Sequence, residues 1–350
     1  MKKHGPAQIA VGIAQVGWRT TIATGLKQGE RETASKVNRP ENANGFFAEN
    51  LRKIQVRSSF RIVRTTNTLI LEPGRIAKNY WRDLLHYREL FFILAWRDVI
   101  VRYKQTTAGA AWAIIQPLMS IVIMTLIFSK LAGLPSERGA PYAIMVCAAT
   151  LPWQFFVNAL SLSSQSVVNN AGLISKIYFP RMIVPASSIA VSLVDFLVAC
   201  SILAGLMMWY HFWPTWRLLV LPALVVLAVA AAFGPGLILT ALTVRYRDFR
   251  MIIPFIVQFG LYVCPVAYSS VYLHEKMVSK LGKSLGDQIY LLYSLNPMVG
   301  VIDGFRWAIL GGPGQFYWPG FAVSVCLTIL LLLVGIAYFR KTERAFADVI

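Results

Sequence analysis

The sequence predicts an all-α integral membrane protein with six transmembrane helices, an N-terminal amphipathic interface helix and a re-entrant external segment before the last span. Composition is the first observation: 56% of the 350 residues are hydrophobic and only 14% are charged, whereas soluble domains carry about a quarter charged residues. The second is a series of charge-free runs long enough for spanning helices of ~20 residues. The third is a net charge of +18, with most of the basic excess before the first run.

Residues 1–75 are predicted to be a basic cytoplasmic extension without stable structure, because the segment is polar and has no regular hydrophobic period. We expect no cleavable signal peptide after Met1, since polar and helix-breaking residues interrupt any apolar core there. A basic tail also suits a nucleic-acid-binding protein, but basic ends beside membrane helices follow from topology alone. We therefore expect no nucleic-acid partner and assign residues 80–350 to one transmembrane domain.

An amphipathic helix is predicted within 80–104. Its apolar residues recur at helical spacing, and charged residues occupy the rest of its circumference. A basic helix of this kind beside a spanning segment is typical of a helix lying in the membrane surface, although a core-facing helix gives a similar pattern. The apolar stripe comprises Phe92, Trp96, Val99 and Tyr103, and the interface residues are Trp96, Arg97, Arg102 and Lys104.

Six spans follow from the apolar runs. Basic residues close to the span ends gather on one side, within 176–181, 245–250 and 340–344, whereas acidic residues dilute those in the other loops. The positive-inside rule makes that side, and both termini, cytoplasmic. The expected spans are 110–132, 142–166, 183–209, 218–242, 251–270 and 318–339.

A further apolar segment, 296–310, is too short to span, and a run of Gly and Pro at 311–314 ends it. A short apolar helix of this kind favours a re-entrant or interfacial element over a seventh span. The residues that mark it are Asn296, Pro297, Gly304 and Arg306.

No catalytic or metal-binding constellation is evident. The four histidines show no ligand spacing, and the four cysteines lie singly inside apolar runs, as small buried hydrophobes do. Gly282-Lys283-Ser284 resembles the end of a phosphate-binding loop, but Met277 stands where that motif requires Gly. We expect no catalytic residue and no metal or cofactor bound by this chain, so that any ATP and Mg²⁺ site lies on a separate subunit.

Asp195 is the one charge in the middle of an expected span, which makes it a functional candidate by default. A proton relay would need several such groups, so we favour a structural hydrogen bond to a neighbouring helix. Aromatic residues recur near the span ends, where an interfacial belt accounts for them. A path for sugars, whose C–H faces stack on flat rings, would also use them. The residues considered for the path are Trp112, Trp153, Phe155 and Phe156.

Several strings resemble, in order, the membrane subunit of type-2 ABC exporters for polysaccharides. The resemblance covers about 80–350. The strings are ELFFILAWRDVIVRYKQTTAGAAWAIIQPL (89–118), LPWQFFVNAL (151–160), LISKIYFPR (173–181), ALTVRYRDFR (241–250), LNPMVGVIDGFRWAIL (295–310) and RKTERAFADVI (340–350).

This resemblance implies a subunit of the bacterial inner membrane that exports O-antigen, capsule or related chains linked to a lipid carrier. It also implies a second copy of the chain, a separate ATPase subunit and contact with membrane lipid. The segment 173–181 would be the coupling helix that rests on the ATPase, and the aromatic path becomes the favoured explanation of the aromatic residues. The coupling residues would be Leu173, Lys176, Tyr178, Phe179 and Arg181.

Two other classes stay open as alternatives. A membrane-embedded glycosyl- or acyltransferase would need clustered Asp, Glu or His at a membrane face, and the sequence shows no such cluster. A proton-coupled secondary transporter would need internal repeats and several intramembrane ionisable groups. Neither is evident, so the exporter subunit is the function that the sequence favours.

Overall fold

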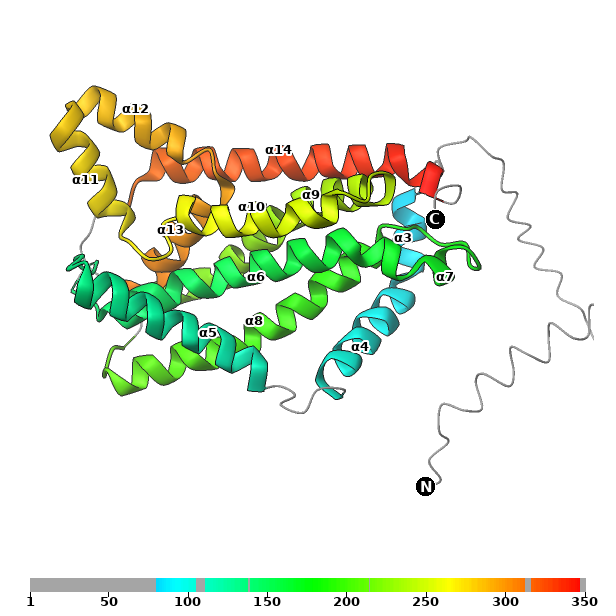
Figure 1. The fold of residues 1–350 in the computed structure, drawn as a ribbon, viewed down its shortest axis with the longest axis horizontal. Helices are drawn as coiled ribbons and strands as arrows, with labels where there is room; N and C mark the ends of the chain where they lie inside the picture. Colours follow the sequence, from blue (N-terminus) through cyan, green and yellow to red (C-terminus); the bar gives the residue numbers. More distant parts are fainter. Residues whose placement is uncertain (1–79, 105–110, 138, 214, 312–315, 347–350) are drawn as a thin grey trace, which may run out of the picture. The chain divides into compact units, whose positions relative to one another are not determined.

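A computed structural model describes residues 80–346 of the chain apart from 105–110, 138, 214 and 312–315. The described part is a bundle of helices (Figure 1), and no strand occurs within it. The expectation of an all-α membrane protein is confirmed. The expected N-terminal extension, 1–75, lies outside the described residues.

Five helices are long and apolar enough to cross a membrane. Their positions lie within a few residues of the ranges 110–132, 142–166, 183–209, 218–242 and 318–339. They are Ala111–Leu131 (α5, Ala111–Met124, continued by the π-helical turn η1, Thr125–Leu131), Tyr142–Asn169 (α6), Ile183–Trp209 (α8), Trp216–Arg245 (the 3-10 turn η2, Trp216–Val220, then α9, Leu221–Arg245) and Trp318–Ala345 (α14, Trp318–Thr342, then the 3-10 turn η3, Glu343–Ala345).

The helix in the remaining expected span is shorter than 251–270. It is α10 (Phe249–Val263), with 15 residues, or about 22 Å at the rise of an α-helix, against a hydrocarbon core of ~30 Å. It ends because Pro265 forces the preceding residue out of the α region, and Cys264 has φ −85° and ψ 146°. By length and composition alone, five of the described helices are therefore candidate spans, and α10 is a shorter apolar helix.

The long segment between α10 and α14 is more helical than the sequence suggests. It holds α11 (Ser270–Leu281) and α12 (Lys283–Tyr293) besides α13 (Pro297–Leu310). Ser269 caps α11 by accepting from the backbone N–H of Tyr272 at 3.1 Å. Gly282 joins α11 and α12 with a φ of +84°, which glycine adopts without steric cost.

The core of the bundle is α6, which packs against α8, α9 and α13. The pair α9 and α14 approaches backbone to backbone, because a Cβ on Gly234 would lie 2.7 Å from the backbone of Leu331. A Cβ on Gly335 would in turn meet the backbone of Gly234. Small residues permit such close approach of membrane helices.

The two ends of the bundle carry different elements. One end holds α3 (Tyr80–His86), α7 (Ala171–Ile174) and the C-terminal end of α14, with α4 (Arg88–Lys104) running off from α3 (Figure 1). The other end holds α11 and α12 (Figure 1). The sites described next are divided between these ends and the junction of α4 with the spans.

Candidate functional site

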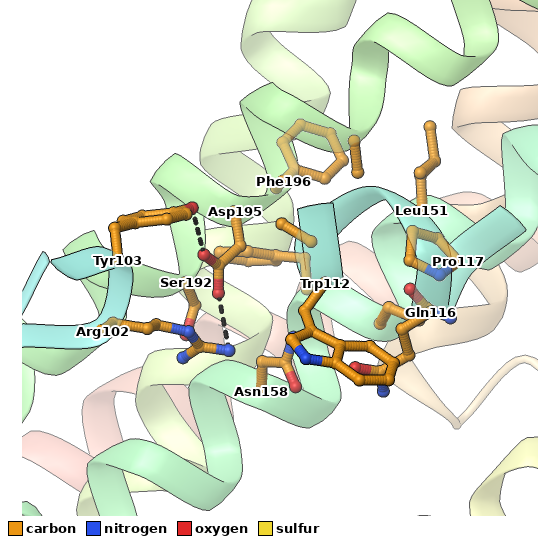
Figure 2. Close-up of a pocket in the computed structure, with 14 residues that line it drawn as sticks. Arg102, Tyr103, Trp112, Gln116, Pro117, Leu151, Asn158, Ser192, Asp195 and Phe196 are labelled. Atoms are coloured by element: carbon orange, nitrogen blue, oxygen red, sulfur yellow. Dashed lines mark hydrogen bonds and ion pairs between the residues drawn. The ribbon is translucent and has the colours of Figure 1, made fainter. Parts of the chain in front are cut away.

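A small cavity of about 130 Å³, lined by both polar and apolar side chains, lies where α4, α5, α6 and α8 meet. Figure 2 shows Arg102 and Tyr103 of α4 directed toward Asp195 of α8, with Trp112 of α5 and Asn158 of α6 beside them. The cavity therefore lies at the junction of the expected interface helix with the first three expected spans.

Asp195 links α8 to α4. Its buried carboxylate accepts a hydrogen bond from the Tyr103 hydroxyl at 2.6 Å and lies 2.9 Å from Nη2 of Arg102. Desolvation, followed by the hydrogen bond to Asp195, raises the pKa of Tyr103 to about 12, so the phenol keeps its proton. Pairing is what makes a carboxylate tolerable at such a site. The hydrogen bond to a neighbouring helix expected for Asp195 is confirmed.

The interface helix α4 divides its apolar residues between two sides. Leu94 is buried in the bundle, whereas Phe92 and Trp96 are 66% and 67% exposed. Large apolar side chains left exposed in this way suit a helix that lies against lipid. The half-buried Tyr103 carries the contact with Asp195 at the end of the same helix.

The charged residues of α4 point to a second contact. Nη2 of Arg97 donates to Oδ1 of Asn170 at 2.8 Å, and Nε of Arg97 donates to Asp98 at 2.8 Å. Asn170 lies between α6 and α7, immediately before the expected coupling segment. Sequence reasoning missed Asn170, because a lone asparagine at a helix end carries no sign of its distant partner. Lys104 is exposed at the end of α4.

The expected coupling residues have different environments. Lys176 is exposed and Tyr178 is 58% exposed, so they form the tip of the turn after α7. Leu173 is half-buried. Phe179 is only 4% exposed and packs into a hydrophobic cluster of this chain. The segment therefore has a short exposed tip, residues 176–178, followed by the buried side chain of Phe179.

Arg181 ties the coupling segment to the C-terminal end of α14. Its Nη1 donates to the backbone oxygen of Glu343, and its guanidinium lies 6.0 Å from the ring centroid of Phe346. The Tyr80 hydroxyl donates to Glu343 at 3.1 Å, and Arg340 lies 4.6 Å over the Tyr80 ring. Sequence analysis placed no role on Tyr80 or Glu343. Together these contacts join α3, the coupling segment and α14, around a cavity of about 530 Å³.

Two of the four path aromatics border the small cavity. Trp112 is 58% exposed. Phe155 is buried and meets the edge of Phe196 with ring centroids 5.7 Å apart. Within this chain Phe155 is therefore a packing residue beside the cavity, while Trp112 presents an open ring.

The other two path aromatics face α10. Trp153 and Phe156 share one face of α6, with ring centroids 5.7 Å apart. Trp153 is 5% exposed and its ring covers Gly260, where a Cβ would lie 2.7 Å from Cη2 of the indole. Phe156 is half-buried. The structure thus brings the four residues to two sides of α6, and their role as a path stays a prediction.

The expected re-entrant segment is the helix α13, and its marker residues fix its position. Asn296 caps it by accepting from the N–H of Met298 at 3.0 Å, and Pro297 occupies its first turn. Gly304 lets Leu224 approach, since a Cβ there would lie 2.7 Å from Cδ2 of that leucine. The helix ends at Gly311, with a φ of +59°.

Arg306 is 1% exposed and acts as a cross-brace. Its three guanidinium nitrogens donate to backbone oxygens of Tyr268 at 2.8 Å, Val266 at 3.0 Å and Met145 at 3.4 Å. These bonds hold α13 against α6 and against the connection between α10 and α11. A buried arginine is tolerable only when hydrogen bonds satisfy its donors, so Arg306 serves structure at this position.

Within the described ranges, no group of three or more His, Cys, Asp or Glu residues is placed to hold a metal ion. The four cysteines are free. The fold and these contacts define a class of protein, a multi-pass membrane protein. Its buried polar contacts hold helices together, and its exposed segments lie at the ends of the bundle.

The family follows from comparison with known proteins. Residues 89–310 match the family model described as ABC-2 type transporter, and the chain belongs to this family. It is 22% identical over 268 residues to the O-antigen export system permease protein RfbA of Myxococcus xanthus, covering 76% of this chain and 97% of that relative. It is 24% identical over 263 residues to the protein of the same name from Klebsiella pneumoniae, covering 75% and 95%. The chain is therefore a transport membrane subunit and is not itself catalytic.

Proposed function

We propose that this chain is the membrane half of an ATP-driven exporter that moves a lipid-linked polysaccharide, such as O-antigen or capsule, across the bacterial inner membrane. The observation that carries the proposal is the family membership over 89–310, together with relatives named as O-antigen export permeases. The pairing of Asp195 with Arg102 and Tyr103 weighs against a proton relay. Export would thus draw its energy from ATP bound, with Mg²⁺, to a separate subunit.

The ATPase would dock on the exposed tip at 176–178. The support is geometric: Tyr178 is exposed, Phe179 anchors the segment, and Arg181 fastens it to α14. A push on the tip would therefore pass to the end of the last span. The hydrogen bond from Arg97 to Asn170 offers a second route, from the same segment to α4.

A second copy of the chain would cover faces that one copy leaves open. Along α10, Phe255, Phe259 and Tyr262 are 61% to 68% exposed, and Ile253 is the one residue of this helix that is buried. The described residues of α5 are also largely exposed. Two copies would enclose a path for the glycan, with Trp112 and the α6 aromatics as its candidate lining.

The topology proposed is six crossings with both termini in the cytoplasm. The sixth crossing would be made by α10 together with the chain that follows it. In this arrangement α13 is the re-entrant external element, and α11 and α12 lie on the outer side. The basic cluster of the C-terminal end, which includes Arg340 and Lys341, would then be cytoplasmic, as the positive-inside rule requires.

Deletion of the gene tests the proposed function. Cells that lack the chain should lose surface polysaccharide and accumulate the lipid-linked glycan inside, and the intact chain should restore export. Purification of the chain should recover an ABC ATPase. Normal surface polysaccharide in the deletion strain would exclude the proposal.

A further inference from the structure

A cavity of about 680 Å³ lies at the bundle end that carries α11 and α12. Its walls come from one face of α11, one face of α12, α13 and the residues just before α14. This volume lies within the range of small-molecule sites, about 300–1,000 Å³. The cavity is separate from the junction in Figure 2 and from the coupling segment.

One wall of the cavity is aromatic. The rings of His274, Tyr290 and Tyr317 contact one another, and the His274 centroid lies 4.7 Å from that of Tyr290 and 4.9 Å from that of Tyr317. Tyr290 and Tyr317 meet at 81° with centroids 5.1 Å apart. Phe316 extends this wall. Such a wall offers flat apolar surface together with phenol and imidazole groups that hydrogen-bond.

The lining also carries carboxyl groups held by hydrogen bonds, two of them bonded to residues of the aromatic wall. Asp303 accepts from Ser270 and, at 3.2 Å, from the Tyr290 hydroxyl. Asp287 pairs with His274 at 2.7 Å. Glu137 accepts from Ser269 at 2.6 Å. Carboxylates fixed in this way are strong acceptors for further hydroxyl donors.

The charges of the lining are unequal. Four carboxyl groups, those of Glu137, Glu275, Asp287 and Asp303, line the cavity together with two cations, Lys283 and Arg306. Burial raises the pKa of Asp303 to about 7, so the other three carboxylates carry most of the negative charge at neutral pH. The guanidinium of Arg306 keeps its charge but its nitrogens are bonded to backbone carbonyls, and Lys283 extends from an exposed position, so the carboxylates outnumber the cations. Such a lining repels anions and accepts neutral or cationic groups.

We propose that this cavity binds one or two sugar residues of the exported chain on its outer side, and that it selects neutral or amino sugars over uronic or phosphorylated ones. This rests on the proposed function. The apolar C–H face of a pyranose would lie on Tyr317 and Phe316, while its hydroxyl or ammonium groups donate to the carboxylates. Neither the aromatic wall nor the acidic side would favour an anionic sugar.

Binding to the full-length chain in lipid nanodiscs tests the site. The probes are neutral tetrasaccharides of gluco, galacto and manno configuration, the chitosan tetramer and tetragalacturonate, followed by saturation-transfer NMR. At least one neutral or amino probe should bind at least tenfold more tightly than tetragalacturonate. Absence of binding by all neutral and amino probes, or equal binding of tetragalacturonate, would overturn the proposal.

Variants separate the site from general stability. Tyr317→Ala should lower the affinity for the bound probe at least tenfold. Tyr272→Ala changes a tyrosine of α11 that lies outside the lining, and it should leave this affinity unchanged. Glu275→Lys, at an exposed position, should admit tetragalacturonate. Equal effects of the two tyrosine variants, or unchanged selectivity in Glu275→Lys, would also overturn it.

The failures of the two proposals are distinguishable. If the deletion strain loses surface polysaccharide but no probe binds, the exporter stands and this sugar site is wrong. If probes bind with the stated selectivity but export continues without the chain, the cavity binds sugars but the exporter proposal is wrong, and the assignment of those sugars to an exported chain falls with it.

Discussion

Two adjacent residues of the coupling segment have opposite surroundings. Tyr178 is 58% exposed, whereas Phe179 is 4% exposed within the cluster beneath it. Tyr178→Ala should therefore leave the protein folded but reduce recovery of the ATPase and export by at least tenfold. Phe179→Ala should instead destabilise the fold by about 3–5 kcal/mol, the range for large-to-small core changes. Co-purification, export and thermal unfolding of each variant distinguish the two effects.

Ile177→Ala is a second variant of the tip, since Ile177 is exposed on the same turn as Tyr178. It should weaken ATPase recovery without altering thermal unfolding. Full recovery of the ATPase by both Tyr178→Ala and Ile177→Ala would show that the tip is not the docking surface.

Variants of Asp195 distinguish a structural role, in which its carboxylate holds α4 against α8, from a role in proton transfer. In Asp195→Asn the side-chain oxygen can still accept from Tyr103, so export should remain within about threefold of the wild-type rate. Asp195→Leu leaves the Tyr103 hydroxyl without this acceptor and should cost about 1–3 kcal/mol of stability. Export assays and thermal unfolding measure both. Complete loss of export in a stably folded Asp195→Asn variant would instead support proton transfer.

Asp303 makes stability depend on pH. The pKa of its carboxyl is raised to about 7, chiefly by desolvation and also by Glu137, against the lowering by Ser270, Arg306 and Tyr290. The unfolded carboxyl titrates near 3.9. The folded state thus holds a proton that the unfolded state has released, so stability should fall as pH rises from about 4 to 7 and change little above that.

Asp303→Asn cannot titrate at this position and should flatten that fall. Thermal unfolding in detergent between pH 4.5 and 8 measures the difference. The matched variant Asp98→Asn, on α4 and far from this cavity, should keep the wild-type slope. Parallel pH profiles for wild type and Asp303→Asn would contradict the assignment.

At the scale of the elements, α9 and α14 depend on two glycines. A Cβ at Gly335 would meet the backbone of Gly234, which cannot yield as a flexible side chain can. Gly335→Ala should therefore destabilise the protein by about 1–3 kcal/mol. Gly205 in α8 has nothing within 4 Å of an added Cβ, so Gly205→Ala should be neutral or stabilising by up to ~1 kcal/mol. Equal melting temperatures for the two variants would show that the helices can separate at little cost.

The helices that the sequence predicts well are those with charge-free apolar runs, because the bilayer requires such runs. The expected range 183–209 and α8, Ile183–Trp209, illustrate this. Helices with charged residues on them were harder to predict. Lys276, Lys280 and Lys283 break the apolar pattern of α11 and α12, so the sequence indicated only a long external loop there.

Some single residues of the candidate site, such as Asp195, could be singled out from the sequence, but their contacts could not. Asp195 stands out because it is a charge within a span, yet its partner Tyr103 is 92 positions away and reads as part of an apolar stripe. Glu343 and Tyr80 are 263 positions apart and belong to no common motif. Such pairs depend on the packing of distant helices, which composition and periodicity do not encode.

At the scale of the whole transmembrane domain, contacts between distant segments support an even number of crossings. Glu343, after α14, contacts Arg181 and Tyr80, at the end where α8 begins. The start of α14 lies at the other end, because Trp318 contacts Trp307, which lies under Arg217 beside η2. Since α9 ends at Arg245, near the first end, the chain between Arg245 and Trp318 must pass from one end to the other.

Reporter fusions test this sixth crossing, which α10 and the residues after it would make. A reporter active only in the cytoplasm should work after Arg344 and fail when inserted within 275–290, while a reporter active only outside the inner membrane should show the reverse. The physical reason is that α10 supplies about 22 Å of helix, and Cys264 to Ser269 continue in extended and turn conformations that add several ångströms. A cytoplasmic reporter that is active within 275–290 would place α11 and α12 inside, and both the six-span topology and the outer position of the sugar cavity would have to be abandoned.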